Sequence, residues 1–276
     1  MTAPNPARPV LGVALTLANL RVHRDWILER QRDLEIQDFI WADLLNGDWR
    51  PLAAEIKAEL AGHTGRVGIH GPFWGLNIAT PDPEIRAVVT KRMQQGLDVC
   101  AELGASHMVI HSPYTTWDYN NLDNNPGSRV QIIERCHDAL RTVVARAEEL
   151  GVTLVIENIE DKDPMARVEL ARSFESKAVR VSLDTGHANY AHGSTGAPPV
   201  DYFVRVAGDM LHHVHLQDTD GHADRHWNPG EGNIAWHAVF RALADLTSNP
   251  RLILEVRHPL TVRSGAEHLA RLGLAE

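Results

Sequence analysis

The sequence predicts a single α/β domain over residues 1–276, folded as a (β/α)8 (TIM) barrel. Short β-rich apolar runs alternate with longer amphipathic stretches along the whole chain, without a linker or a break in composition. The length of 276 residues suits the fold, because such barrels typically need about 250 residues. Six of the apolar runs end on a residue type that binds metals, and a closed ring of parallel strands would bring all six to one end.

In the first half of the chain, apolar β-rich runs predict strands at residues 10–17, 34–40, 66–70 and 106–111. Helices are predicted at residues 23–32 and 51–62, and from residue 83 onward, where apolar residues recur at spacings of three and four. Asp82 followed by Pro83 is a typical helix start, and Gly104 is a typical helix end.

The connection at residues 112–128, SPYTTWDYNNLDNNPGS, is the longest irregular stretch. It is rich in turn-forming and aromatic residues, and it follows a barrel strand. Loops in this position often cover active sites, so the stretch is a candidate lid.

The second half predicts a helix at residues 129–150 that ends at Gly151, and a further helix after DKDP at 161–164. Strands are predicted at residues 152–159, 179–184, 210–218 and 251–256, and a last helix closes near Leu274. A doubly wound open sheet would show the same alternation, but it would carry a glycine-rich phosphate turn after the first strand. The sequence there reads ANLRVHRD, so the closed barrel is favoured.

Composition excludes few partners but sets the expected compartment. The net charge of -9 gives no overall attraction to nucleic acid or to an anionic membrane, although a local basic rim could still bind DNA. The sequence has no apolar run long enough for a membrane span, and its N-terminus lacks a signal peptide. Cys100 and Cys136 fall in helical stretches and are expected to be reduced core thiols. A cytosolic protein is therefore expected.

Four of the strand ends predict a metal site. Glu157, Asp184 and Glu255 each end an apolar strand, where a carboxylate is costly to bury unless it meets a cation or a proton. Any one of them could instead pair with an arginine or cap the next helix, but three on one ring would repel each other without a metal. Alternation in HHVHLQD places His213 and His215 on one strand face. His215 lies nearer the strand end and is the candidate ligand, with His213 one layer deeper.

This set of three carboxylates and one histidine suits Mn, Mg, Co or Zn. Five further side chains could join it as ligands, namely His70, His111, His187, Asp224 and His226. His70 and His111 could instead bind substrate or pack in the core, and Asp224 and His226 could form an exposed salt-bridged loop.

These residues resemble those of the xylose isomerase-like TIM barrels, a superfamily that includes sugar phosphate isomerases and epimerases as well as endonuclease IV. The resemblance runs from the third predicted strand to the eighth. It is carried by IHGPFWGLNIATPDPE, VIHSPY, VIENIED, SLDTGHANY, HVHLQDTDGHADRHWNPGEGNIAW and LILEVR.

Resemblance to the ketose epimerases implies one divalent metal ion, held by Glu157, Asp184, His215 and Glu255. It also implies that Glu157 and Glu255 transfer the proton through a metal-stabilised enediolate. The substrate would be a small sugar. Its candidate contacts are His70, His111, His187, Trp74, Tyr114, Trp117 and Arg257.

Resemblance to endonuclease IV implies up to three zinc ions, because all nine of that branch's ligand positions have a match among the residues above. The chain departs from that branch at Gly186, where a cysteine is usual, and at ENIED, where a glycine-rich sequence is usual. Only Arg129, Lys162, Arg225 and Arg257 are expected near the barrel mouth. A sugar isomerase or epimerase is therefore favoured, with a trinuclear zinc phosphodiesterase acting on abasic DNA as the alternative. The sequence leaves open the sugar and the oligomeric state, a homo-oligomer included.

Overall fold

The structure, a computed structural model, describes residues 8–276 and confirms the predicted (β/α)8 barrel. Eight parallel strands close into a ring in chain order, and β1 pairs with β8 through Gly12 and Ile253. The strands are β1 Gly12–Leu15, β2 Leu34–Ile36, β3 Val67–His70, β4 His107–His111, β5 Thr153–Glu157, β6 Val179–Asp184, β7 Leu211–Leu216 and β8 Arg251–Leu254.

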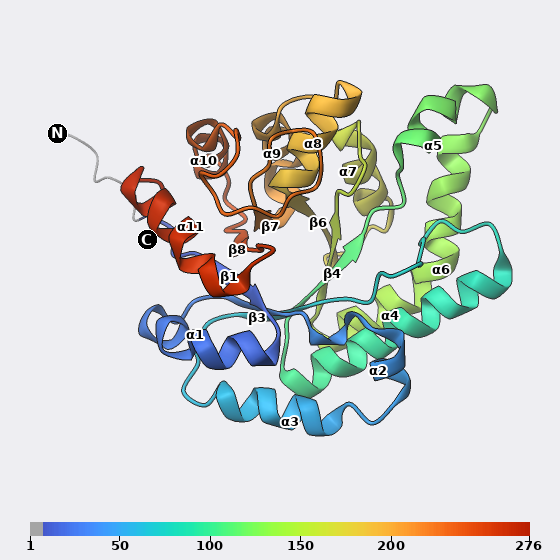
Figure 1. Cartoon of the computed structure of the whole chain (residues 1–276). Coiled ribbons are helices and arrows are strands. Elements are labelled where there is room, and N and C mark those ends of the chain that lie inside the picture. The colour runs from blue at the N-terminus through green and yellow to red at the C-terminus, as the bar shows by residue number, and fades with distance from the viewer. Residues whose placement is uncertain (1–7) are drawn as a thin grey trace.

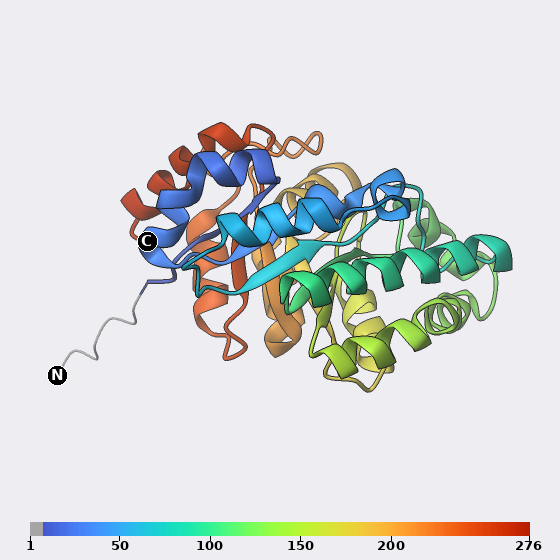
Figure 2. The same cartoon turned by 90° about the horizontal axis from the view of Figure 1, so that it is seen from below.

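Helices surround the strands on the outside in both views (Figures 1 and 2). The last helix lies beside the first, which completes the outer ring, and Arg263 of the last helix bonds to His23 of the first. The helices are α1 Leu17–Arg30, α2 Ala42–Asn46, α3 Arg50–Glu59, α4 Pro83–Leu103, α5 Thr116–Asn121, α6 Ser128–Leu150, α7 Pro164–Ser173, α8 Thr185–Thr195, α9 Val200–Ala207, α10 Trp236–Ala244 and α11 Val262–Arg271.

Capping residues set several of these boundaries as predicted. The Asp82 carboxylate accepts hydrogen bonds from the backbone N–H groups of Glu84 and Ile85, at 2.8 and 3.3 Å, and so starts α4. Gly104 and Gly151 end α4 and α6 at φ values of 67° and 66°. This left-handed conformation favours glycine.

Three predicted boundaries are wrong, and they lie next to β1, β2 and β4. The strand predicted at residues 34–40 ends at Ile36, and a 3-10 helix follows at Asp38–Ile40. The Asp38 carboxylate turns back to accept from the Leu17 N–H, at 2.9 Å, where α1 begins six residues earlier than expected. The stretch at 112–128, predicted to be irregular, contains α5, because the Thr115 hydroxyl accepts from the Asp118 N–H and starts that helix.

The barrel interior carries several buried polar side chains, whereas the outer faces of the strands are apolar. Leu154, Ile156 and Leu254 are fully buried in the hydrophobic core; full burial of such a side chain contributes roughly 1.5–3 kcal/mol. The alternating positions turn inward, where Ser182 of β6 bonds to His213 of β7 at 2.9 Å. Buried polar side chains inside the ring thus lead directly to the strand ends.

Cys100 and Cys136 are free, buried thiols on α4 and α6, and burial raises the pKa of each. Within residues 8–276, no helix combines the length and the apolar character that crossing a bilayer requires.

Candidate metal centre

The nine predicted ligand side chains gather at the carboxyl end of the barrel into three groups. The atoms that each group offers lie within 4.8 Å of one another. We name them the inner group, Glu157, Asp184, His215 and Glu255; the middle group, His70, His111 and Glu157; and the outer group, His187, Asp224 and His226. Glu157 belongs to two groups, so the inner and middle groups form one connected set of donors.

The inner group surrounds one nitrogen atom of His215. Its Nδ1 lies 2.6 Å from Oε1 of Glu157 and 3.2 Å from Oε2 of Glu255. Asp184 also caps α8, because its Oδ1 accepts from the His187 N–H at 2.7 Å. The second oxygens of Glu157 and Asp184 are buried and find no hydrogen-bond donor within the described part of the chain. Buried carboxylate oxygens need such a partner or a cation.

The inner group sets three carboxylates against one imidazole, a balance of charges that favours a bound proton or cation. Burial raises the pKa of Asp184 to about 6, since the neighbouring Glu157 and Glu255 charges add to burial and outweigh His187 and His226. Burial lowers the pKa of His215, but Glu255, Glu35 and Glu157 outweigh it and raise that pKa well above its usual value. A metal ion could take the place of that proton. Three carboxylates and one imidazole fit a divalent ion such as Mn, Mg, Co or Zn.

The middle group presents two imidazoles in a form that could bind metal. His70 Nδ1 donates to the Gly71 carbonyl at 2.8 Å, so in the neutral ring Nε2 carries the lone pair, and it faces Glu157 Oε2 at 3.7 Å. His111 Nε2 lies 3.6 Å from the same oxygen. Burial lowers the pKa of His70, but Glu157, Glu35 and Glu255 raise it overall. Burial lowers the pKa of His111 to about 3, which keeps the ring neutral.

The outer group is assembled on the loop after β7 and on α8. His187 Nδ1 donates to the Asn158 carbonyl at 2.8 Å, and its Nε2 lies 3.3 Å from Asp224 Oδ2. His226 Nε2 lies 3.2 Å from the same oxygen. Burial lowers the pKa of His226, but Asp224, Glu255 and Asp184 raise it overall to about 9.

Three polar side chains that the sequence reasoning missed hold these groups in place. Gln217 Nε2 donates to Asp184 Oδ1 at 3.1 Å and to Asp224 Oδ1 at 2.9 Å, which links the inner and outer groups. Gln37 donates to the Glu255 carboxylate. Glu35, in β2, approaches His215 from the side opposite the inner group. The one feature of the sequence that could have pointed to Glu35 is that a charged residue stands in a short apolar strand.

A cavity of about 350 Å3 opens over the three groups. Members of all three line it, together with Ile40, Phe73 and Trp74. Its size falls in the range of roughly 300–1,000 Å3 that small-molecule sites occupy. Trp74 lines this cavity, as does His111, and both were predicted to contact substrate.

Three other predicted contacts do not line this cavity. Tyr114 is buried in the hydrophobic core. Trp117 lies on α5 with 76% of its surface exposed, because the helix started by Thr115 turns it toward solvent. Arg257 is exposed, and it is tied to the site only through its backbone N–H, which donates to the His226 carbonyl at 2.6 Å.

Comparison with known proteins gives the same family for most of the chain. Residues 35–272 match the family model described as xylose isomerase-like TIM barrel. The chain is 30% identical over 218 residues to a D-psicose 3-epimerase of Ruminiclostridium cellulolyticum, covering 73% of this chain and 67% of that protein. It is 28% identical over 200 residues to a probable endonuclease 4 of Mycobacterium ulcerans, covering 67% and 72%.

The alignments span from 60% to 72% of the length of the curated relatives, so part of each relative lies outside the match. Among solved structures, the TTHB071 protein of Thermus thermophilus, soaked with ZnCl2, is 28% identical. It has a TM-score of 0.71, and the match covers 95% of this chain and 97% of that chain.

Proposed function

Because the chain belongs to the xylose isomerase-like TIM barrel family, we propose that it is a divalent-metal-dependent sugar isomerase or epimerase. The observation that carries the proposal is the convergence of two glutamates on one nitrogen atom below the cavity. Glu157 ends β5 and Glu255 follows β8, and their carboxylates approach His215 Nδ1 at 2.6 and 3.2 Å. The likeness to a D-psicose 3-epimerase supports this choice of substrate class.

When bound to the inner group, a divalent ion would polarise the substrate carbonyl and orient a neighbouring hydroxyl. Glu157 and Glu255 are the proton-transfer pair: one removes the carbon-bound proton and the other returns a proton to the opposite face. Such acid–base work contributes typically about 10²–10⁴-fold to a rate. Gln37 holds the Glu255 carboxylate. His187 turns its Nε2 toward Asp224 at the cavity and would contact a substrate hydroxyl.

The size and charge of the mouth favour a small molecule. A DNA-binding enzyme needs a positively charged face for the phosphate backbone. Arg225 pairs with Asp220 at 2.9 Å and stacks over Trp227. Lys162 lies over the Tyr119 ring. These two predicted mouth cations are therefore engaged within the chain, and the net charge is -9.

A second candidate function is a trinuclear zinc phosphodiesterase acting on abasic DNA. It is favoured by one specific observation, that all nine predicted ligands fall into three groups and two of the groups share Glu157. The likeness to a probable endonuclease 4 agrees with it.

The proposal is tested by proton exchange into ketoses. Purified protein, loaded in turn with Mn, Mg, Co or Zn, is incubated in D2O with D-psicose, D-fructose or D-tagatose, and NMR follows loss of the carbon-bound proton next to the carbonyl. We expect metal-dependent exchange that is lost in Glu255→Gln and retained in Glu169→Gln, an exposed glutamate of α7.

The same samples separate the two functions. Elemental analysis should find about one divalent ion per chain. Three zinc ions per chain, no exchange into any ketose, and cleavage of an abasic-site oligonucleotide that Glu157→Gln abolishes would establish the phosphodiesterase instead.

A further inference from the structure

We propose that Glu35 is a positioning residue that fixes the His215 ring with Nδ1 facing the inner group. Glu35 stands in the middle of β2, Leu34–Ile36, and is 2% exposed. It was not among the predicted ligands, and it does not line the cavity over the three groups. Its carboxylate reaches the site only through a histidine.

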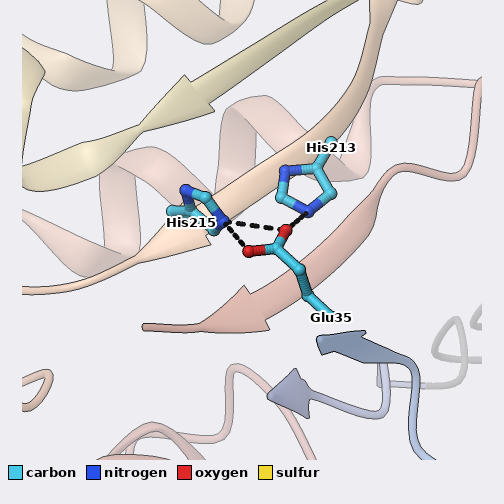
Figure 3. Close-up of side chains that lie close together, drawn as sticks. All are labelled: Glu35, His213 and His215. Atoms are coloured by element: carbon cyan, nitrogen blue, oxygen red, sulfur yellow. Dashed lines mark hydrogen bonds and ion pairs between the residues drawn. The ribbon is translucent and has the colours of Figure 1, made fainter. Parts of the chain in front are cut away.

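The carboxylate of Glu35 contacts two imidazoles at once (Figure 3). Both of its oxygens lie 3.1 Å from His215 Nε2, and Oε2 lies 3.0 Å from His213 Nε2. An ionised carboxylate only accepts hydrogen bonds, so each Nε2 must carry a hydrogen. Glu35 thereby sets the same tautomer on both rings.

The contact between Ser182 and His213 is consistent with that tautomer. With a hydrogen on Nε2, His213 offers a lone pair on Nδ1, and the Ser182 hydroxyl lies 2.9 Å away to donate to it. His213 is 1% exposed and Ser182 is fully buried, so water does not compete. The chain from Ser182 through His213 to Glu35 is hydrogen-bonded throughout, and it ends on His215.

A separate metal ion between Glu35 and the two rings would conflict with one in the inner group. The separations of 3.0–3.1 Å between the carboxylate oxygens and the ring nitrogens fit hydrogen bonds. An ion held there and another in the inner group would together strip both hydrogens from His215. With Glu35 as acceptor, Nε2 keeps its hydrogen and Nδ1 is free for the inner group.

This arrangement has two consequences for the inner group. Hydrogen bonding to the second nitrogen stops the ring from turning, and it makes the ligating nitrogen more basic. Loss of such a partner typically weakens metal binding about 10–100-fold. The inference rests on the metal-binding part of the proposed function, and not on the identity of the sugar.

The first test is zinc affinity, measured by competition with a chromophoric chelator. We expect Glu35→Gln to bind zinc roughly 10–100-fold more weakly than the natural protein, since the amide is uncharged and its NH2 group replaces one of the two oxygens that face His215 Nε2. Asp218→Asn is the matched control. Asp218 is also buried, but it accepts from the Gly230 N–H and from Trp236 Nε1 at 2.8 and 3.0 Å, away from the ligands. It should lose stability and keep its zinc affinity.

The second test needs no variant. In the zinc-loaded natural protein, 15N NMR of the imidazoles should show His215 bound through Nδ1 with a hydrogen on Nε2. Binding through Nε2, or zinc affinity in Glu35→Gln equal to that of the natural protein, would overturn the inference. A natural protein that binds no zinc, manganese or cobalt would instead overturn the metal-binding part of the proposed function, and this inference with it.

Discussion

The inner and outer groups contain similar residue types but differ in their access to water. In the inner group, the side chains of His215 and Asp184 are fully buried and that of Glu157 is 1% exposed. In the outer group, Asp224 is 44% exposed and His226 is 27% exposed. A buried carboxylate must be neutralised by a proton or a cation, whereas a hydrated one need not be. The burial of the inner group therefore favours a bound cation or proton there more strongly than in the outer group.

The largest effect is expected at Glu157, which belongs to the inner and middle groups. Glu157→Gln keeps the shape of the side chain but removes a carboxylate that lies 2.6 Å from His215. We expect the rate of proton exchange into a ketose to fall at least about 10²–10⁴-fold, and metal content to fall with it. NMR exchange rates and elemental analysis of the same sample measure both. Exchange that persists at the natural rate would mean that the inner group is not the catalytic centre.

The link between the two groups is tested at Gly186, the position at which the endonuclease IV branch usually carries cysteine. A Cβ atom there would overlap the side chain of Gln217, which joins Asp184 to Asp224. We expect Gly186→Ala to lower the free energy of unfolding by about 1–3 kcal/mol, as overpacking usually does. Urea unfolding of the metal-free protein measures it, with Ser194→Ala on the exposed side of α8 as control.

A double-mutant cycle shows whether the overlap is the cause. In a Gln217→Ala background the space is free, so the cost of Gly186→Ala should shrink. Costs that add without any coupling would place the damage elsewhere.

Strand alternation and strand ends explain why the sequence could predict that these side chains lie together. Glu157, Asp184 and His215 lie at or next to the ends of parallel strands, and a barrel brings all such ends together. Gln217 and Glu35 could not be predicted in the same way, because an amide or a single glutamate acquires a role only from side chains far along the chain. Their partners lie 33 and 180 residues away.

The wrong predictions have a different cause. Residues 112–128 have no regular apolar spacing, and the one signal of a helix there is Thr115 with Asp118 three residues later, the spacing of a helix N-cap. That helix directs Trp117 to solvent, and Tyr114 just before it enters the core. The orientation of aromatic residues in such a stretch depends on capping contacts that a spacing argument does not contain.

The stability of the metal-free protein should fall in two separate pH ranges, one set by Asp184 of the inner group and one by His226 of the outer group. The pKa of Asp184 is raised from 3.8 to about 6, so its contribution to stability is present below pH 3.8 and is lost as the pH rises to 6. The pKa of His226 is raised from 6.5 to about 9, so its contribution is present below pH 6.5 and is lost as the pH rises to 9. The loss should be roughly 3 kcal/mol for the buried Asp184 and roughly 1–2 kcal/mol for the partly exposed His226, whose charge is screened by water.

Single variants show which residue causes the loss of stability in each pH range. In urea unfolding at a series of pH values, Asp184→Asn should flatten the change between pH 4 and 6 most strongly, and His226→Gln the change between pH 6.5 and 9. Bound metal should reverse the trend, because ligands must be deprotonated to bind it. A metal-free protein whose stability rises from pH 6.5 to 9 would contradict the assignment of His226.

The smallest effect on proton exchange is expected at Asp224. This variant tests whether the outer group, unlike the inner group, works without a metal ion of its own. Asp224→Asn removes a charge that is 44% exposed and that water can replace. If the outer group only contacts substrate, exchange should fall less than about tenfold, a difference under about 1.4 kcal/mol, and metal content should stay at one ion per chain. Asp184→Asn, in the buried inner group, is the control that should lose both. If Asp224→Asn instead removes a bound zinc ion and abolishes all activity, the outer group holds its own metal, and the phosphodiesterase becomes the better account of the site.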